Sequence, residues 1–434
     1  MVPTEDSPLA AAKRALNTLP SRLNLYRTSV AYQLPSDIQT KIIVLSDTHG
    51  EPLKRKVNTT ADVAIHCGDL TDESKLDEFK ATIEQLKAIG APIKLVIAGN
   101  HDFTLDDNAY AYTRNEVKRT IDDAALTRTY GSIGEARVLF ESEDAKSAGI
   151  VFLSEGTHKI SLKNGALLTV YASPYTPSKS SGWGFQYDPQ QGEHHWEIDS
   201  SVDLVMAHGP AHGVLDYTGS RQRAGSPSLF AAIAKAKPKM HCFGHIHESW
   251  GAKLVTWRPE TSDEPSHFTD IDNDRSTLIE SRATLHNGNF DDQELLDAKA
   301  AKRTTFYEQG YRDMNDSITA NEQTLFVNAA IEGVEEDEQH LPWLVNVSLP
   351  VLEISKTDDA GTADEVAIRG VREAEKVGEP DSVLAASKKR RADAMAGEAL
   401  AGGSCAENGR SAKRRAVLGW GHRSLRRRRR DALT

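Results

Sequence analysis

The sequence predicts a layered α/β domain, because short apolar runs typical of strands alternate with helical or polar segments. The chain has 434 residues, of which 39% are hydrophobic and 26% charged, so it is long enough to bury a large core. No run reaches the roughly 18 to 20 apolar residues that a membrane span needs. Six short apolar runs stand out: 41–46, 62–67, 93–98, 167–172, 203–207 and 239–243. The first three are too apolar to have a wet face and are predicted as central strands, and the other three continue the pattern.

Two helices are predicted from local patterns. Apolar residues recur at helical spacing within residues 76–89, between the second and third runs, with Thr71 or Asp72 available as the N-cap. This helix would be a crossover, so the strands on either side of it should be parallel. A second helix is predicted to begin at Pro227, because Ser226 is a good N-cap and proline is favoured in the first turn.

Composition divides the chain into parts. Residues 258–322 are polar with weak periodicity, whereas strand-like runs return at 324–331 and 343–352 and are expected to complete the sheet. Beyond residue 356 the chain has few aromatic or β-branched residues, so it is predicted to be disordered. The predicted parts are an N-terminal extension (1–37), a main domain (38–257), a polar insertion (258–322), closing strands of the main domain (323–355) and a disordered basic tail (356–434).

Charge is distributed unevenly along the chain. The net charge of the whole chain is −11, yet from Lys388 onward 14 Lys and Arg stand against 4 Asp and Glu. The residues before Lys388 therefore carry a net negative charge and are called the acidic body. This charge argues against a protein that binds nucleic acid over its whole surface, since the phosphate backbone binds clustered positive charge. The basic tail has three explanations: it binds import machinery or nucleic acid, it is a solvated terminus with no partner, or it results from an incorrect gene model.

The expected compartment is intracellular, either cytoplasmic or nuclear. Two of the three cysteines, Cys67 and Cys242, lie in apolar runs, so a disulfide scaffold is not expected. Glu5 and Asp6 stand where a secretory signal would carry positive charge, and no apolar segment follows them.

Polar motifs follow five of the six predicted strands. Their sequences are D-T-H-G at 47–50, G-D-L-T-D at 68–72, G-N-H-D at 99–102, H-G-P at 208–210 and G-H-I-H at 244–247. Carboxylate, imidazole and amide groups brought to one sheet edge would form a mixed N/O pocket for divalent transition metals. The donors exceed the needs of one ion and suit two ions that share a carboxylate. Turn formation alone would explain the Asp and Asn residues, but it does not explain four histidines at matching strand ends.

These five motifs (blocks), in this order, resemble those of the calcineurin-like metallophosphoesterases. The residues in and around them are most similar to the metallophosphoesterase-domain phosphodiesterases. The resemblance covers Ile38 to Trp257 and resumes in the closing strands. It implies a sandwich of two stacked β-sheets flanked by helices. It also implies hydrolysis of a P–O bond by a water or hydroxide that bridges two divalent transition-metal ions, Mn, Fe or Zn.

The resemblance assigns roles to individual residues. Asp47, His49 and His247 would hold the first metal, Asn100, His208 and His245 the second, and Asp69 would bridge them. His101 would face the scissile phosphate as a general acid or a charge stabiliser, oriented by Asp102, and Asp72 would lie just behind the ligands.

A phosphodiester, such as a cyclic nucleotide, is the expected small substrate, because the five blocks contain no Arg or Lys to clamp a more highly charged monoester. The second block also lacks the arginine of Ser/Thr protein phosphatases, since Glu73 follows Asp72. The alternatives are a phosphomonoesterase that takes its cation from Arg221 or Arg223, a catalytically weak metal-bound scaffold, and a nuclear nuclease with a basic groove.

Other conspicuous residues have simpler explanations. His66, His158 and His241 are expected to be packed or hydrogen-bonded side chains rather than ligands. Trp183 either stacks on a substrate base or packs within the protein.

Overall fold

The computed structural model describes residues 37–117, 122–179, 183–314, 317–335 and 337–352. All of them fall in the first of two units, residues 1–374, and the second unit, 375–434, lies outside the described residues. Nearly all of the predicted N-terminal extension and the whole predicted tail therefore also lie outside them.

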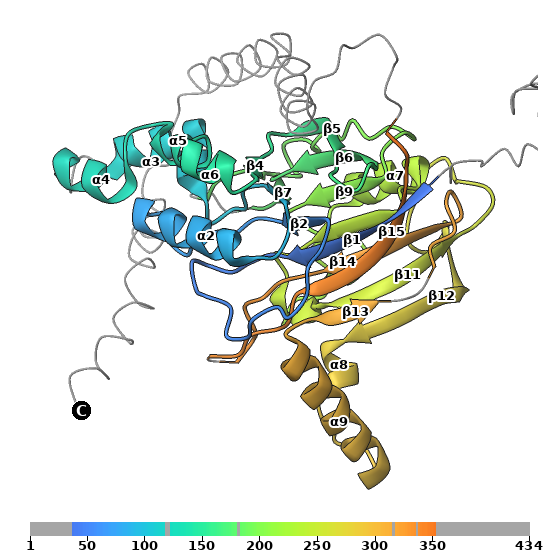
Figure 1. Ribbon diagram of the computed structural model, residues 1–434. Helices are drawn as coiled ribbons and strands as arrows, with labels where there is room; N and C mark the ends of the chain where they lie inside the picture. Colours follow the sequence, from blue (N-terminus) through green and yellow to red (C-terminus); the bar gives the residue numbers. More distant parts are fainter. Residues whose placement is uncertain (1–36, 118–121, 180–182, 315–316, 336, 353–434) are drawn as a thin grey trace, which may run out of the picture. The chain divides into compact units, whose positions relative to one another are not determined.

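One sheet has six strands in the order β13-β15-β1-β2-β3-β4 (Figure 1). Four consecutive strands of this sheet are parallel to one another: β1 (Asp37–Leu45), β2 (Val63–His66), β3 (Ile93–Val96) and β4 (Ile150–Phe152). The crossover helix predicted this direction for β2 and β3. Strand β15 (Trp343–Pro350) pairs antiparallel to β1, and β13 (Arg312–Met314) pairs parallel to β15.

The other sheet has seven strands in the order β12-β11-β14-β10-β9-β6-β5. Its central strands run parallel: β6 (Leu167–Ser173), β9 (Leu204–Ala207), β10 (Met240–Phe243) and β14 (Gln323–Asn328). Antiparallel strands flank them on both sides: β5 (Gly156–Ser161), β11 (Gly251–Trp257) and β12 (Ile271–Ser281). The two closing runs therefore complete different sheets, whereas the sequence suggested a single one.

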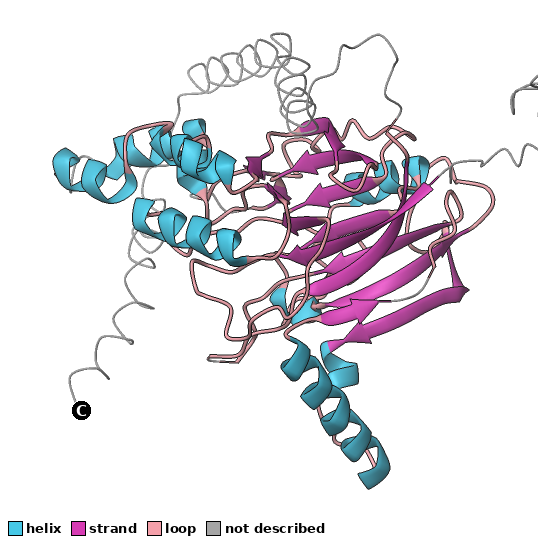
Figure 2. Cartoon of the chain, viewed as in Figure 1, coloured by secondary structure: helices cyan, strands magenta, loops and turns pink. Residues whose placement is uncertain are grey.

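The main core lies between the sheets, and helices cover their outer faces. Inward residues of both sheets, such as Val44 and Met206, belong to one buried apolar cluster. Phe79 of α2 and Phe140 of α5 pack on the six-stranded sheet, and Ile233 of α7 packs on the seven-stranded one. In Figures 1 and 2 the helices α2 to α6 gather apart from α7. The helices are α2 (Leu76–Ala88), α3 (Asp107–Val117), α4 (Asp123–Tyr130), α5 (Glu135–Phe140), α6 (Glu143–Ser147) and α7 (Pro227–Ala236).

The two predicted helix starts have different outcomes. Ser226 caps α7, because its hydroxyl accepts a hydrogen bond from the backbone N–H of Leu229 at 3.1 Å. The predicted cap of α2 is wrong, since the cap residue is Lys75. The Thr71 hydroxyl lies before the helix, where it donates to Asp102 at 2.7 Å and accepts from the backbone N–H of Ser74 at 3.1 Å.

The polar segment 258–322 contributes an edge strand to each sheet. It contains β12 at the edge of the seven-stranded sheet and β13 at the edge of the six-stranded sheet. Between them lie α8 (Arg282–Leu285) and α9 (Gln293–Gln309), which project away from the sheets in Figure 1. Among the described residues, no helix combines the length and apolarity that a membrane crossing requires.

Candidate metal centre

The predicted ligands follow strands of both sheets, at their carboxyl ends. Asp69 and Asn100 follow β2 and β3 of one sheet, whereas His208 and His245 follow β9 and β10 of the other. The chain turns sharply at these points, since φ is 53° at Asp47, 50° at Asp69 and 67° at His245. This left-handed region is uncommon for residues other than glycine, and such strain concentrates at functional sites.

Neighbouring glycines leave room for the ligands. A Cβ added at Gly244 would lie 1.8 Å from Oδ2 of Asp47, and one at Gly99 would lie 2.3 Å from Oδ1 of Asp69. No side-chain atom fits at either distance, so only glycine lets the backbone pass this close to the two carboxylates.

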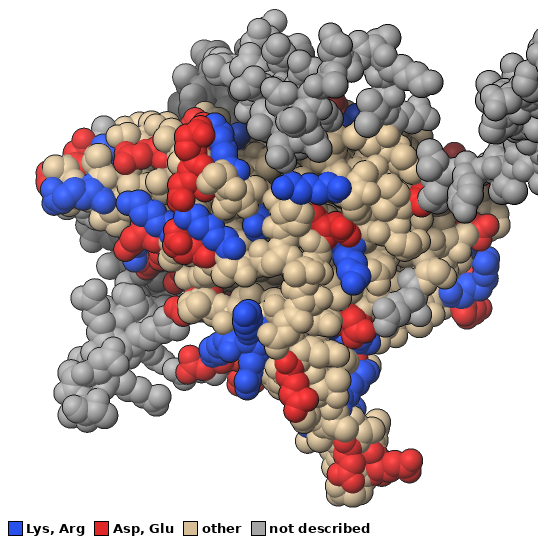
Figure 3. All heavy atoms as spheres, viewed as in Figure 1, with Lys and Arg blue, Asp and Glu red and all other residues tan. Residues whose placement is uncertain are grey.

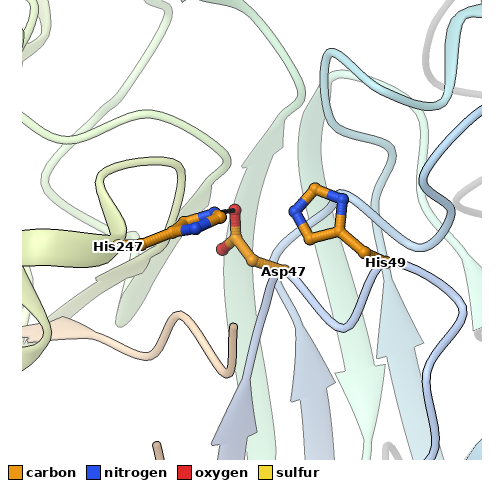
Figure 4. Close-up of side chains that lie close together, drawn as sticks. All are labelled: Asp47, His49 and His247. Carbon is orange, nitrogen blue, oxygen red and sulfur yellow. Dashed lines mark hydrogen bonds and ion pairs between the residues drawn. The ribbon is translucent and has the colours of Figure 1, made fainter. Parts of the chain in front are cut away.

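The first compact group consists of Asp47, His49 and His247, whose ligand atoms all lie within 4.8 Å of one another. In Figure 4 the two imidazole rings lie on opposite sides of the Asp47 carboxylate, and Nε2 of His247 is 3.3 Å from its Oδ1. The backbone N–H of His245 donates to both oxygens of Asp47, at 2.9 and 3.0 Å, and holds the carboxylate in place.

The second compact group consists of Asp69, His208 and His245. Nε2 of His208 lies 3.4 Å from Oδ2 of Asp69 and 3.0 Å from Oδ1 of Asn100. Its Nδ1 lies 2.9 Å from the carbonyl oxygen of Cys67, which can only accept a hydrogen bond. That contact places the proton on Nδ1 and leaves Nε2 as the atom that could bind a metal.

Asp69 lies between the two groups. Its Oδ2 is 3.8 Å from Nε2 of His49 and 3.4 Å from Nε2 of His208. Its Oδ1 accepts a hydrogen bond from the backbone N–H of His101 at 2.8 Å, which fixes the carboxylate. One carboxylate thus faces histidines from both groups, which is the arrangement that a bridging ligand requires.

The charges in the site are balanced among its own side chains. Burial acts to raise the pKa of Asp47 and of Asp69, but hydrogen bonds and charge interactions with histidine outweigh it and hold both values well below the ordinary range. Burial acts in the opposite direction on His208 and His247, and there the neighbouring carboxylates prevail and raise each pKa to about 9. The carboxylates of Asp47 and Asp69 thus favour positive charge on these two rings, as they would favour a cation beside them.

Two other histidines are held neutral. Burial lowers the pKa of His49 to about 4 and that of His245 to about 3. His49 is buried, and both of its ring nitrogens lack a hydrogen-bond partner within the described structure. A buried imidazole with two unsatisfied nitrogens is costly unless a ligand satisfies it, so the donor set fits a transition metal.

His101 lies beside the metal ligands and is held from two sides. Its Nδ1 is 2.7 Å from the carbonyl oxygen of Asp72, and its ring meets that of His49 edge to face at 4.6 Å. Trp183 packs over the His101 ring at 4.1 Å, with the two planes 33° apart. Of the two roles considered for Trp183, the structure shows packing within the protein.

The expectation that Asp102 orients His101 is wrong. The buried Asp102 carboxylate accepts hydrogen bonds from the backbone N–H groups of Leu70, Thr71 and Gly99 and from the Thr71 hydroxyl. It therefore ties the second motif to the third. Burial, with the charge of Asp69 adding to it, raises the pKa of Asp102 to about 7. Asp72 takes the predicted orienting part instead, through its backbone carbonyl.

The three histidines predicted to be packed or hydrogen-bonded side chains make such contacts. Nε2 of His66 lies 2.9 Å from the Thr48 hydroxyl, and Nε2 of His158 lies 2.9 Å from the Ser154 carbonyl oxygen. His241 is fully buried and stacks on Phe243 at 4.6 Å.

One carboxylate at this centre was not predicted. Oε2 of Glu332 lies 3.1 Å from Nε2 of His49 and 3.9 Å from Nδ1 of His247. The available signal was its place after the apolar run 324–331, since the predicted ligands likewise follow strands. It was missed because the surrounding sequence lacks a recognisable ligand motif.

Residues 40–249 match the family model described as calcineurin-like phosphoesterase. The chain is 29% identical over 219 residues to metallophosphoesterase domain-containing protein 1 of Homo sapiens, a match that covers 49% of this chain and 62% of that protein. It is 26% identical over 211 residues to a UPF0046 protein of Caenorhabditis elegans, covering 49% and 64%. A match of 31% identity to the probable rhamnogalacturonate lyase C of Emericella nidulans covers 51% of this chain but 18% of that protein. The chain thus spans less than two thirds of the length of each of these relatives.

Proposed function

We propose that the chain, whose residues 40–249 match the calcineurin-like phosphoesterase model, hydrolyses a phosphodiester, such as a cyclic nucleotide, at a dinuclear metal centre. The observation that carries the proposal is the position of Asp69 between His49 and His208. The proposed ligands of one ion are Asp47, His49 and His247, those of the other are Asn100, His208 and His245, and Asp69 is shared.

The donor set supports Mn, Fe or Zn as the two ions. Imidazole, carboxylate and amide donors suit these transition metals, whereas Mg²⁺ prefers sites built from oxygen alone. When bound, the two ions would lower the pKa of a water molecule and neutralise the phosphoryl oxygens. Chelation should therefore abolish turnover, and Mn²⁺ should restore it better than Mg²⁺.

His101 is the proposed proton donor to the leaving alkoxide. The Asp72 carbonyl oxygen can only accept, so Nδ1 of His101 keeps its proton and Nε2 remains the atom that exchanges one with the substrate. Trp183, packed on the ring, limits its rotation. Proton donation from a positioned histidine is worth about 10² to 10⁴ in rate.

Charge favours a diester over a monoester. The five ligand motifs contain no Lys or Arg that could balance an extra phosphate charge, and the ion pairs described for the ligand residues join histidine to Asp or Glu. Arg223, one of the two cations considered for a monoesterase, is paired with the buried Asp216 and packs over the Tyr217 ring. A diester carries one negative charge fewer than a fully ionised monoester, so it depends less on such a cation.

The nuclease alternative gains no support from the surface that Figure 3 displays. Lys and Arg are interspersed with Asp and Glu on this face, instead of forming one basic field. A groove that binds a nucleic-acid strand would need continuous positive charge.

Substrate preference tests the proposal. Protein loaded with Mn²⁺ should show a higher kcat/KM for bis(p-nitrophenyl) phosphate and a 2′,3′-cyclic nucleotide than for p-nitrophenyl phosphate. The reverse order across several pairs would indicate a phosphomonoesterase, and loaded protein inactive on every substrate would indicate a metal-bound scaffold. Asp69→Asn must remove the activity, which excludes a contaminating phosphatase.

A further inference from the structure

Glu332 is brought to the metal centre by the backbone that follows β14. The N–H of Ile331 donates to the carbonyl oxygen of Ser46 at 2.8 Å, and the N–H of Glu332 donates to that of Asp47 at 3.0 Å. Glu332 is therefore locked beside the turn that carries two of the proposed ligands. Its place is fixed by the fold, even though its side chain is 46% exposed.

The contact between Glu332 and His49 is close but is not a hydrogen bond. Oε2 of Glu332 lies 3.1 Å from Nε2 of His49, yet both nitrogens of this buried ring remain without a hydrogen-bond partner in the described structure. Two donor atoms bound to one ion at about 2.1 Å, at right angles, are about 3 Å apart. The spacing therefore matches two neighbouring ligands of a single ion.

We propose that Glu332 is an additional carboxylate ligand of the first ion, beside Asp47, His49 and His247. This inference rests on the proposed function, because it assumes that the centre binds metal. A third carboxylate, after Asp47 and Asp69, adds negative charge where the first ion would lie and so strengthens its binding. The exposed side chain also places this ligand at the rim of the site, where it can adjust to the ion.

Binding of Mn²⁺ to the metal-free protein tests the assignment without measuring activity. Titration with free Mn²⁺ followed by electron paramagnetic resonance should give two bound ions for the wild type. In Glu332→Gln one ion should bind about 10-fold to 100-fold more weakly, the usual effect of losing a supporting group at a metal site. Glu332→Asp keeps the charge on a shorter side chain and should lose less.

Glu335→Gln is the matched control. Glu335 lies on the same loop, is exposed, and the contacts described for it are made by its backbone. The control should bind Mn²⁺ like the wild type. Superimposable isotherms for the wild type and Glu332→Gln would overturn the role of Glu332 but leave the proposed metal centre standing. A wild type that binds no Mn²⁺ would refute the metal centre and this inference with it.

A double-mutant cycle identifies the ion concerned. In a His49→Ala background the first ion is already weakened, so Glu332→Gln should cause little further loss. In a His245→Ala background the full loss should persist, because His245 belongs to the other group. Equal losses in both backgrounds would contradict the assignment to the first ion. The melting temperatures of the metal-free variants should match within each background, since the Glu332 side chain is half exposed.

Discussion

At the scale of single residues, the centre depends on backbone positions that few residue types can occupy. Asp47 and His245 hold left-handed conformations, and the N–H of His245 anchors the Asp47 carboxylate. Gly244, directly before His245, passes so close to Asp47 that no side chain fits. Metal affinity should therefore be sensitive to residues that carry no donor atom.

Gly244→Ala should displace the Asp47 carboxylate and lower the content of the first ion and the turnover together. The physical reason is steric, because the new Cβ would stand 1.8 Å from Oδ2 of Asp47. Elemental analysis of the purified protein measures the metal. Gly219→Ala is the control, since its Cβ would meet only the movable end of Glu248. Full metal content in Gly244→Ala would show that the carboxylate can move without loss.

Asp69→Asn and His101→Ala should separate metal binding from proton transfer. Asp69 faces both groups of ligands, so its loss should reduce metal content and turnover together. His101→Ala should retain both ions and lower kcat by about 10² to 10⁴. Metal analysis and steady-state kinetics on the same preparations give both values. An empty site in His101→Ala would make His101 a ligand, a role that its compact group with His49 and Asp69 would permit.

At the scale of elements, the central strands carry buried histidines as well as apolar side chains. His241 in β10 is fully buried, and its Nδ1 lies 3.3 Å from the Val205 carbonyl oxygen in β9. Burial lowers the pKa of His241 to about 3, with the backbone contact opposing it. This strand therefore contributes to the pH dependence of stability.

Acid should destabilise the fold in part through His241. Its pKa is lower in the folded protein than the ordinary value of about 6.5 in the unfolded chain, so the unfolded state binds more protons as pH falls below that value. Between pH 7.5 and 5.5 this one group should reduce the free energy of unfolding by about 1.4 kcal/mol. Urea unfolding at both pH values should show a smaller difference in His241→Asn, by about that amount. An unchanged difference would mean that His241 is protonated at little cost in the folded protein.

At the scale of the whole molecule, the acidic body and the basic tail predict separate roles. The catalytic residues proposed here lie between Asp47 and Glu332, whereas the excess of Lys and Arg begins at Lys388. The tail lies outside the described residues, and its sequence has few of the aromatic and β-branched residues that build a core. Folding and chemistry should therefore be independent of it.

Deletion from Lys388 onward should leave the melting temperature and kcat/KM nearly unchanged. If import machinery binds the basic runs, the same deletion should abolish the nuclear enrichment of a tagged protein. Fluorescence microscopy of the full-length and truncated proteins measures this. A full-length protein that never concentrates in nuclei would remove the nuclear localisation, and a large drop in melting temperature would show that the tail supports the fold.

The sequence by itself determined the local features of this protein. Each ligand motif directly follows an apolar run, so the pairing of strand and motif could be predicted from neighbouring residues. The crossover helix between β2 and β3 likewise required parallel strands. The start of α7 was predictable because a cap acts within one turn.

Only the tertiary structure decided which distant segments meet. β14 and β15 have similar apolar sequences, yet they join different sheets, because strand partners are chosen by packing across the whole core. The backbone carbonyl of Asp72, and not the carboxylate of Asp102, reaches His101, because the fold places the Asp102 side chain against the backbone N–H groups of the second motif. Glu332 reaches His49 across 283 positions of sequence through backbone hydrogen bonds to Ser46 and Asp47, a pairing that no local pattern encodes.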